Sequence, residues 1–241
     1  MLARIVLAGA CLAAAPALAQ ETPPPERPRP LCDGIYATAT LTSDYRYEGL
    51  SSSNRHPTGQ ALAHCYRTDG WYVGMLVTGI DYLDTPRTRA EIDVYAGRRV
   101  RRGRWELNLN LLYSTFRPGR PQGSGYDLIE PVVEVVRFSG RATWTTKVAL
   151  AWNDRTRRTW HLSESLAYRL APGLSANSRV GALFSDRGMD RTFGEVGLAV
   201  SWRRWTLEAR YVATDRSRGQ CYGLDWCDAG ATAAVTYRLL P

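Results

Sequence analysis

His161 and Ser163 are a pair of residues whose types and spacing suit nucleophilic catalysis. They lie in the segment Trp160 to Leu170, and side chains two positions apart on a β-strand point to the same side. A histidine placed in this way can serve as the general base for a serine nucleophile. The opposite face carries Glu164 and four large apolar residues, namely Trp160, Leu162, Leu166 and Tyr168. In this register the pair belongs to the polar face, and a shift by one residue would turn it to the apolar face.

Charged and amide side chains recur on the polar faces of other segments, and they separate by sign along the chain. The acidic residues come first, and they are Glu91, Asp93, Glu106, Glu130 and Glu134. The basic residues follow, and they are Arg141, Lys147, Arg169 and Arg179. The same faces carry Asn108, Asn110, Glu195 and Arg210. These groups could form an acidic wall and a basic wall, or pair with one another and fill the interior, and the sequence leaves both interpretations open.

The cysteines favour disulfides over a metal site. A zinc site would need close cysteine pairs supported by histidine, whereas His56, His64 and His161 are scattered. We therefore expect no metal and no cofactor. The five-residue gap between Cys221 and Cys227 suits a disulfide that staples a loop in an oxidising compartment. A bridge between Cys32 and Cys65 is a weaker candidate because their strand parities differ.

The elements that position these residues are short amphipathic strands. In WELNLNLLYS, Trp105 to Ser114, apolar and polar residues alternate with a period of two, and only Leu112 breaks the pattern. This period indicates a strand with one dry and one wet face. The pattern recurs to give twelve strands: 35–48, 59–66, 71–78, 91–96, 105–114, 128–135, 143–152, 160–170, 174–182, 195–202, 205–211 and 231–239.

The connections between these strands alternate in length. Long polar links such as FRPGRPQGSG and SDRGMDRT follow the odd-numbered strands, and short links such as TDG, GRRVRRGR and APG follow the even-numbered ones. Outer-membrane barrels combine this asymmetry with an even strand count and aromatic rims. The expected rim residues are Trp71, Trp105 and Trp205 on the periplasmic side and Tyr45, Tyr47, Tyr113 and Trp152 on the outer side. A soluble β-sandwich has the same alternation but no reason for rim aromatics or for this asymmetry of links.

The N-terminus predicts export. Residues 1–19 combine Arg4, an apolar run and a small-x-small end, which is typical of a signal peptide cleaved before Gln20. The Pro-rich residues 20–33 are expected to form a periplasmic tail, and residues 34–241 the barrel. No later apolar run reaches the ~18 residues of a membrane helix.

The charge balance is basic. The chain carries 31 Lys and Arg against 23 Asp and Glu, a formal net charge of +8, and Lys147 is its only lysine. An exported chain rarely meets nucleic acid, so we expect none as a partner. Arginine pairs well with phosphate and carboxylate, and outer-membrane lipid and lipopolysaccharide offer both.

Three motifs resemble the TorF family of porins. The segment TSDYRYEGLS, Thr42 to Ser51, resembles the family's SDYRFRGIS-type opening, GWYVG from Gly70 resembles its GFYVG hairpin, and EIDVYAG from Glu91 resembles its ELDLYAG strand. The resemblance spans roughly residues 35 to 240 and implies an outer-membrane barrel that forms a pore, without an established substrate. The chain departs from a typical outer-membrane ending, because YRLLP lacks a terminal aromatic.

The sequence therefore predicts a porin-like barrel in the bacterial outer membrane for small polar or anionic solutes. Lys147 is expected mid-strand near the constriction, so that Lys147→Glu should lower or reverse an anion preference while the fold stays intact. One alternative is a lipid hydrolase, since His161-Leu162-Ser163 resembles the His-x-Ser of outer-membrane phospholipase A and of lipid A deacylase, although Glu164 replaces the Asn that follows there. The other alternative is a structural or adhesive barrel without an open pore. The sequence indicates no oligomeric state.

Overall fold

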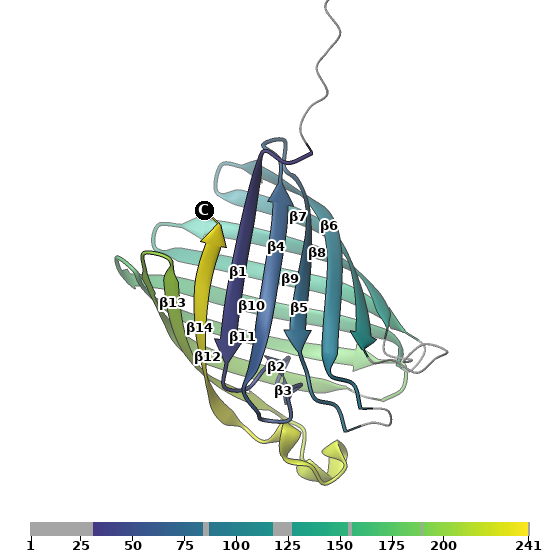
Figure 1. Cartoon of the computed structure of the whole chain (residues 1–241). Helices are drawn as coiled ribbons and strands as arrows, with labels where there is room; N and C mark the ends of the chain where they lie inside the picture. Colours follow the sequence, from purple (N-terminus) through teal and green to yellow (C-terminus); the bar gives the residue numbers. More distant parts are fainter. Residues whose placement is uncertain (1–30, 84–86, 118–126, 154–155, 189, 241) are drawn as a thin grey trace, which may run out of the picture. The chain divides into compact units, whose positions relative to one another are not determined.

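Twelve antiparallel strands, each paired with its neighbours along the chain, close into a barrel because the last strand pairs with the first (Figure 1). The computed structural model describes residues 31–83, 87–117, 127–153, 156–188 and 190–240. The strands are β1 (Gly34–Thr42), β4 (Thr58–Tyr66), β5 (Trp71–Gly79), β6 (Ala90–Arg102), β7 (Trp105–Arg117), β8 (Leu128–Ser139), β9 (Ala142–Asn153), β10 (Arg157–Ala171), β11 (Leu174–Ser185), β12 (Arg191–Trp202), β13 (Trp205–Thr214) and β14 (Gly230–Leu240). The predicted antiparallel barrel of twelve strands is confirmed. The predicted signal peptide and residues 20–30 of the tail lie outside the described residues.

The two faces of each strand meet different surroundings. On β7, Trp105, Leu109 and Leu111 are about half exposed on the outside of the barrel, whereas Asn108 and Ser114 are 5% and 2% exposed on the inside. Leu112, which breaks the alternation of the sequence, lies on the inner face between polar neighbours. The wall is therefore apolar on its outer surface and mostly polar toward the interior.

The prediction for the first strand was wrong in its extent. The predicted strand ran to Glu48, but β1 ends at Thr42, and β2 (Arg46–Tyr47) and β3 (Leu50–Ser51) form a separate two-stranded sheet. The chain turns here because the buried Asp44 accepts a hydrogen bond from Arg46, two residues further on, and because Glu48 and Gly49 adopt positive φ angles of 50° and 92°. The Ser43 hydroxyl accepts a hydrogen bond from the amide of Ala233 on β14. Tyr45 and Tyr47 consequently do not belong to an outer rim.

The connections differ between the two ends of the barrel. At one end the turns are tight and use residues with positive φ, among them Gly70, Gly103, Gly140 and Gly173. The link GRRVRRGR is shorter than predicted, because β6 continues to Arg102. We call this the short-turn end. Trp71, Trp105 and Trp205 begin their strands there and expose about half of their surface.

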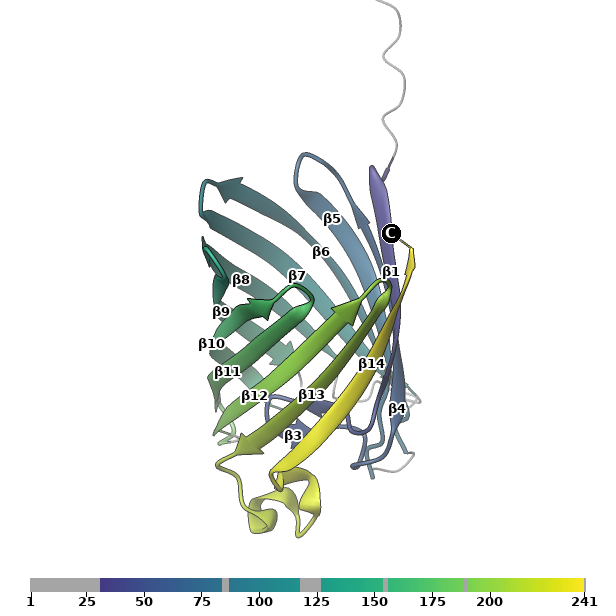
Figure 2. The ribbon, with the colours of Figure 1, turned by 90° about the vertical axis from the view of Figure 1, so that its left-hand side faces the viewer.

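The opposite end, which we call the long-connection end, carries the extended links and the β2–β3 sheet (Figure 2). The link between β13 and β14 contains the short 3-10 helices η1 (Arg218–Cys221) and η2 (Asp225–Cys227). Within the described residues, no helix is long and apolar enough to span a membrane.

Candidate pore constriction

The segment 43–57, which we call the inner loop, folds into the barrel and places one carboxylate against the wall. Glu48 lies at the tip of the β2–β3 turn and is 4% exposed. Its Oε1 atom lies 2.9 Å from Nδ1 of His161 on β10 and 3.6 Å from Nη2 of Arg179 on β11. Its Oε2 atom lies 3.6 Å from Nη2 of Arg191 on β12, and the Arg191 Nε donates a 3.1 Å hydrogen bond to the Glu48 carbonyl. We call these four residues the Glu48 clamp.

A second carboxylate extends the clamp toward β8 and β9. Glu130 is 1% exposed, and its Oε1 accepts a 3.2 Å hydrogen bond from the Lys147 Nζ. Its Oε2 lies 3.9 Å from Nε2 of His161, so that the His161 ring stands between the two carboxylates. The ring of Tyr47 packs near His161, with 6.4 Å between centroids. Five neighbouring strands, β8 to β12, and the inner loop thus share one network of charges.

The electrostatics of the clamp favour an ionised Glu48. Burial opposes ionisation of this group. The hydrogen bond with His161 and the positive charge of Arg191 outweigh burial, so the pKa of the Glu48 carboxyl lies below its ordinary value of 4.5. A buried carboxylate that faces three potential cations is stable as an anion, and it holds the inner loop against the basic side of the wall.

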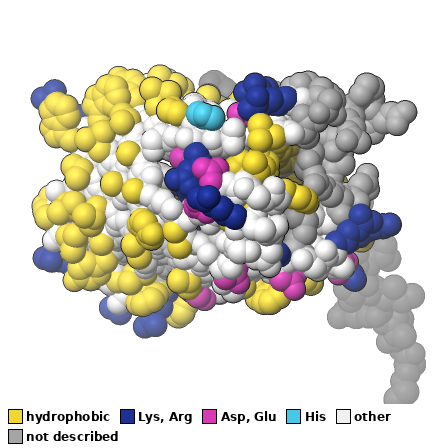
Figure 3. Space-filling model, turned by 90° about the horizontal axis from the view of Figure 1, so that it is seen from below, with side chains coloured by type: hydrophobic (Ala, Val, Ile, Leu, Met, Phe, Trp, Pro, Cys, Tyr) yellow, Lys and Arg dark blue, Asp and Glu magenta, His cyan; other side chains and the backbone are white. Residues whose placement is uncertain are grey.

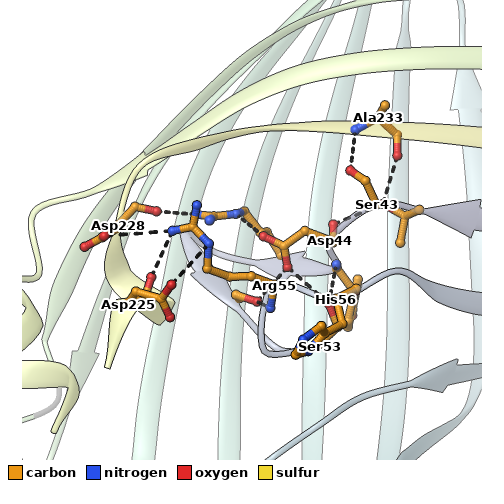
Figure 4. Close-up of polar contacts among 12 residues, drawn as sticks. Ser43, Asp44, Ser53, Arg55, His56, Asp225, Asp228 and Ala233 are labelled. Carbon is orange, nitrogen blue, oxygen red and sulfur yellow. Dashed lines mark hydrogen bonds and ion pairs between the residues drawn. The ribbon is translucent and has the colours of Figure 1, made fainter. Parts of the chain in front are cut away.

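A buried acid also fixes the base of the inner loop (Figure 4). The Asp44 carboxylate accepts hydrogen bonds of 2.6 Å from the Arg46 Nε, 2.6 Å from the Ser51 Oγ and 3.1 Å from the Ser53 Oγ. Ser43 is joined to Ala233 of β14 by its backbone N–H, which donates to the carbonyl, and by its hydroxyl, which accepts from the amide. Asp44 therefore ties the two halves of the inner loop together where it leaves β1.

The last long connection, residues 215–229, holds the inner loop from outside. Arg46 Nη1 donates a 2.7 Å hydrogen bond to the Asp228 carbonyl, and Arg55 Nε lies 3.5 Å from the Asp225 carboxylate. The Trp226 indole donates a 2.8 Å hydrogen bond to the Asn54 side chain. Viewed from the long-connection end, acidic and basic side chains gather over the middle of the barrel mouth (Figure 3).

The structure pairs all four described cysteines. Cys221 is bonded to Cys227 in the last connection, as the spacing predicts. Cys32 is bonded to Cys65, which the parity argument disfavoured. That argument was wrong because Cys32 precedes β1 and Cys65 lies beside Ile35 at the same end of the barrel.

The alternation of the strands turns the predicted lumen residues inward, with one exception. They are Glu91 and Asp93 on β6, Glu106, Asn108 and Asn110 on β7, Glu130 and Glu134 on β8, Lys147 on β9, Arg169 on β10, Arg179 on β11, Glu195 on β12 and Arg210 on β13. The exception is Arg141, which lies exposed in the turn between β8 and β9 and not on the strand wall.

Many of these charges are paired. Arg210 Nη1 lies 3.2 Å from Glu195 and its Nε 3.6 Å from Glu208, while Asn108 donates a 2.7 Å hydrogen bond to Glu134. The acidic and basic groups therefore meet in local pairs. The separation by sign that the sequence predicts survives in part, because the acidic Glu91 and Asp93 are on β6, whereas the basic Arg179 and Arg191 are on the distant strands β11 and β12.

Comparison with known proteins places the chain in a family. A family model described as a bacterial protein of unknown function (Gcw_chp) matches residues 33–237. The chain belongs to this family. No protein with a curated description matches it.

Solved structures with a similar fold are porins and channels. The KdgM porin gives a TM-score of 0.59 at 8% identity, over 85% of this chain and 98% of the porin. The NanC porin gives 0.59 at 10% identity, over 85% of this chain and 100% of the porin. The COG4313 outer membrane channel from Pseudomonas putida F1 gives 0.55 at 10% identity, over 92% and 100% of the two chains. At these identities the likeness shows the fold of outer-membrane porins.

The structure places His161 and Ser163, the pair of the hydrolase alternative, inside the barrel. The register of β10 places His161 opposite Ala149 and turns both His161 and Ser163 into the barrel, without the one-residue shift that would expose them on the apolar side. No hydrogen bond joins His161 to Ser163 among the described residues, and the His161 Nδ1 is engaged by Glu48 instead. Glu164 faces outward and accepts a 2.7 Å hydrogen bond from the Thr146 hydroxyl.

Sequence reasoning missed the inner-loop half of this site. The sequence pattern predicts a strand that includes Asp44, Arg46 and Glu48, and a loop that includes Arg191. A signal for the turn was present in the Glu48-Gly49 dipeptide and in the serine run from Ser51, both of which favour a turn over a long strand.

Proposed function

We propose that this chain is a porin-like channel of the bacterial outer membrane, through which small polar solutes diffuse and anions pass preferentially. The observation that carries the proposal is a closed barrel of twelve strands with an apolar outer surface and a polar, charged interior, which suits a wall between lipid and water. The KdgM and NanC porins, of which nearly the whole length is matched, support it. The motifs that resemble the TorF family of porins point to the same function.

The expected location follows from the same arrangement. The tryptophans at the short-turn end suit the periplasmic interface, and the arginines of the long connections suit lipopolysaccharide on the outer side. Folded protein should migrate faster on gels before heating than after, and its mature N-terminus should be Gln20. Recovery of the folded protein from the soluble periplasmic fraction would contradict this location.

The preference for anions rests on the constriction. Lys147, His161, Arg179 and Arg191 stand on the adjacent strands β9 to β12. They outnumber the two carboxylates that they face, Glu48 and Glu130. A passage with an excess of one charge concentrates ions of opposite sign. A structure of the KdgM porin holds disordered oligogalacturonate. For this chain the charges of the constriction favour anionic solutes in general and not one particular anion.

Conductance in a planar bilayer tests the proposal. Purified protein should give discrete channels, and the reversal potential in a KCl gradient should show a modest preference for chloride over potassium. Cation preference would refute the role of the basic residues. Absence of conductance over a range of voltages would refute the pore and favour a structural or adhesive barrel.

A further inference from the structure

A cluster of aromatic side chains lines the barrel interior near the short-turn end, away from the constriction. The cluster borders a cavity of about 500 Å³, a size typical of small-molecule sites. The strands β1, β4, β5 and β6 contribute the inward-facing side chains. We call the following set the tyrosine pocket: Tyr36, His64, Tyr66, Tyr72, Tyr95 and Arg99.

Three of the tyrosine rings occupy the space beside glycines of the neighbouring strand. Tyr66 lies opposite Gly34, Tyr95 opposite Gly74, and Tyr72 opposite Gly97. A Cβ atom added at each of these glycines would overlap the ring of its partner. The absent side chains leave room for the rings against the backbone of the wall. Tyr72 is 6% exposed, so Tyr66 offers the most accessible ring of the three. Tyr66 keeps 42% of its surface exposed.

Hydrogen bonds and ring contacts fix these rings before any ligand arrives. The Tyr72 hydroxyl donates a 2.6 Å hydrogen bond to the Asn108 side chain, and His64 Nδ1 lies 3.2 Å from the Tyr95 hydroxyl. The His64 ring stacks on Tyr72 with 5.1 Å between centroids. A pocket whose side chains are already ordered loses little conformational entropy on binding.

Arg99 supplies the positive charge of the pocket. Its guanidinium lies 4.8 Å from the centroid of the Tyr72 ring. Among the residues that the structure describes, no carboxylate lies within ion-pair distance of Arg99, whereas Arg179 and Arg210 are both paired. An exposed guanidinium over an aromatic ring is suited to bidentate pairing with a carboxylate.

We propose that the tyrosine pocket binds a sugar acid, that is, a pyranose ring that carries one carboxylate. The C–H face of a pyranose is weakly positive and matches the negative face of an aromatic ring. The carboxylate would pair with Arg99, and the sugar hydroxyls would meet the tyrosine hydroxyls and His64. This inference rests on the proposed function in one respect, namely that the solute reaches the pocket through the barrel. It narrows the proposed solutes from small anions to sugar acids.

Calorimetric titration of the purified protein in detergent tests the site without any need for conductance. The probe is glucuronate, compared with glucose, which lacks the carboxylate, and with benzoate, which lacks the sugar ring. Glucuronate should bind most tightly of the three. Tighter binding of benzoate would overturn the sugar assignment, and equal binding of glucose would overturn the role of the carboxylate.

Two matched pairs of variants locate the site. Arg99→Gln should weaken glucuronate binding roughly tenfold or more, since a hydrogen bond to a charged group is lost. Arg98→Gln should leave binding unchanged, because Arg98 is on the outer face of the same strand, with its guanidinium 5.5 Å from the Trp71 ring. Tyr66→Leu should also weaken binding, and Tyr113→Leu, which removes an outward ring of similar exposure on β7, should not.

Heat-modifiable migration shows that each variant is folded before titration, and Arg99→Gln decides the question if Tyr66→Leu does not fold. Unchanged affinity in folded Arg99→Gln, or no binding of glucuronate by the wild type, would overturn the proposal. Because binding is measured at equilibrium, channels without glucuronate binding would refute this site alone, and binding without channels would refute the pore alone.

Discussion

The Glu48 carboxylate and the His161 imidazole are hydrogen-bonded at 2.9 Å across the barrel interior, although 113 residues separate them in the sequence. One residue belongs to the inner loop and the other to the wall. This contact sets the position of the inner loop, because Arg179 and Arg191 converge on the same carboxylate.

Removal of the Glu48 carboxylate should release the inner loop. Glu48→Ala leaves Arg179 and Arg191 without their common anion, and loss of one partner from a buried ion pair costs about 3–5 kcal/mol of folding stability. We expect a larger and noisier single-channel current and a lower unfolding temperature. Glu208→Ala is the matched control, because Glu208 pairs with Arg210 on the wall and not with the inner loop. Equal currents in Glu48→Ala and the wild type would contradict the clamp.

Acid should release the same contact. A carboxyl group whose pKa is lowered by folding stabilises the folded arrangement above its ordinary value of 4.5, and this contribution disappears as the pH falls through the lowered value. The current should therefore stay constant from neutral pH down to about 4.5 and change only in more acidic solution. Glu48→Ala should lack this transition. A change of the wild-type current near pH 6 to 7 would show that a group other than Glu48 controls it.

Much of the barrel could be predicted from the sequence, because apolar and polar residues alternate within each strand according to the face on which they lie. The alternation from Trp105 to Ser114 depends only on which surroundings each side chain meets, so strand number and lumen faces follow from local pattern. The inner loop could not be predicted in this way. Arg46 and Tyr47 alternate like a strand, and the contacts that hold the inner loop inside the barrel come from His161, Arg191 and Asp228, which are distant in the sequence.

The charged residues of the lumen could be predicted by position but not by pairing. Lys147 and Glu134 lie directly opposite each other on β9 and β8, yet the Lys147 ammonium reaches Glu130 instead. A long flexible side chain can reach several partners, and here Glu134 accepts a hydrogen bond from Asn108 while Lys147 bonds to Glu130. Strand register alone does not contain this information.

The pairing of Lys147 changes the expected outcome of its substitution. Lys147→Glu would set a second carboxylate beside the buried Glu130, so we expect loss of folded protein in place of the intact fold that the sequence predicts. Lys147→Gln should fold with stability lowered by about 3 kcal/mol and with a weaker anion preference. The double variant Lys147→Glu with Glu130→Lys should recover folding by restoring the pair. Reversal potentials and thermal unfolding measure both effects, and full stability of Lys147→Glu alone would show that the pair is unimportant.

The disulfide between Cys221 and Cys227 should restrain the inner loop. It closes the connection in which Asp225 and Asp228 face Arg55 and Arg46. Replacement of both cysteines by serine should increase current noise and protease cleavage within residues 215–229. The same replacement at Cys32 and Cys65, at the short-turn end, is the matched control and should leave the current unchanged. Peptide mapping without reduction should recover both bonds, and free thiols at Cys221 and Cys227 in protein taken from the envelope would count against the arrangement.

The contacts between the inner loop and the last connection also impose an order on assembly. Ser43 bonds to Ala233 and Arg46 to Asp228, so the base of the inner loop needs both the beginning and the end of the chain in place. These bonds cross the seam at which β14 joins β1. An open sheet that has not yet received its final strand lacks this support. The base of the inner loop therefore gains this support only when the seam closes, so a firmly held inner loop indicates that the last hairpin has been inserted.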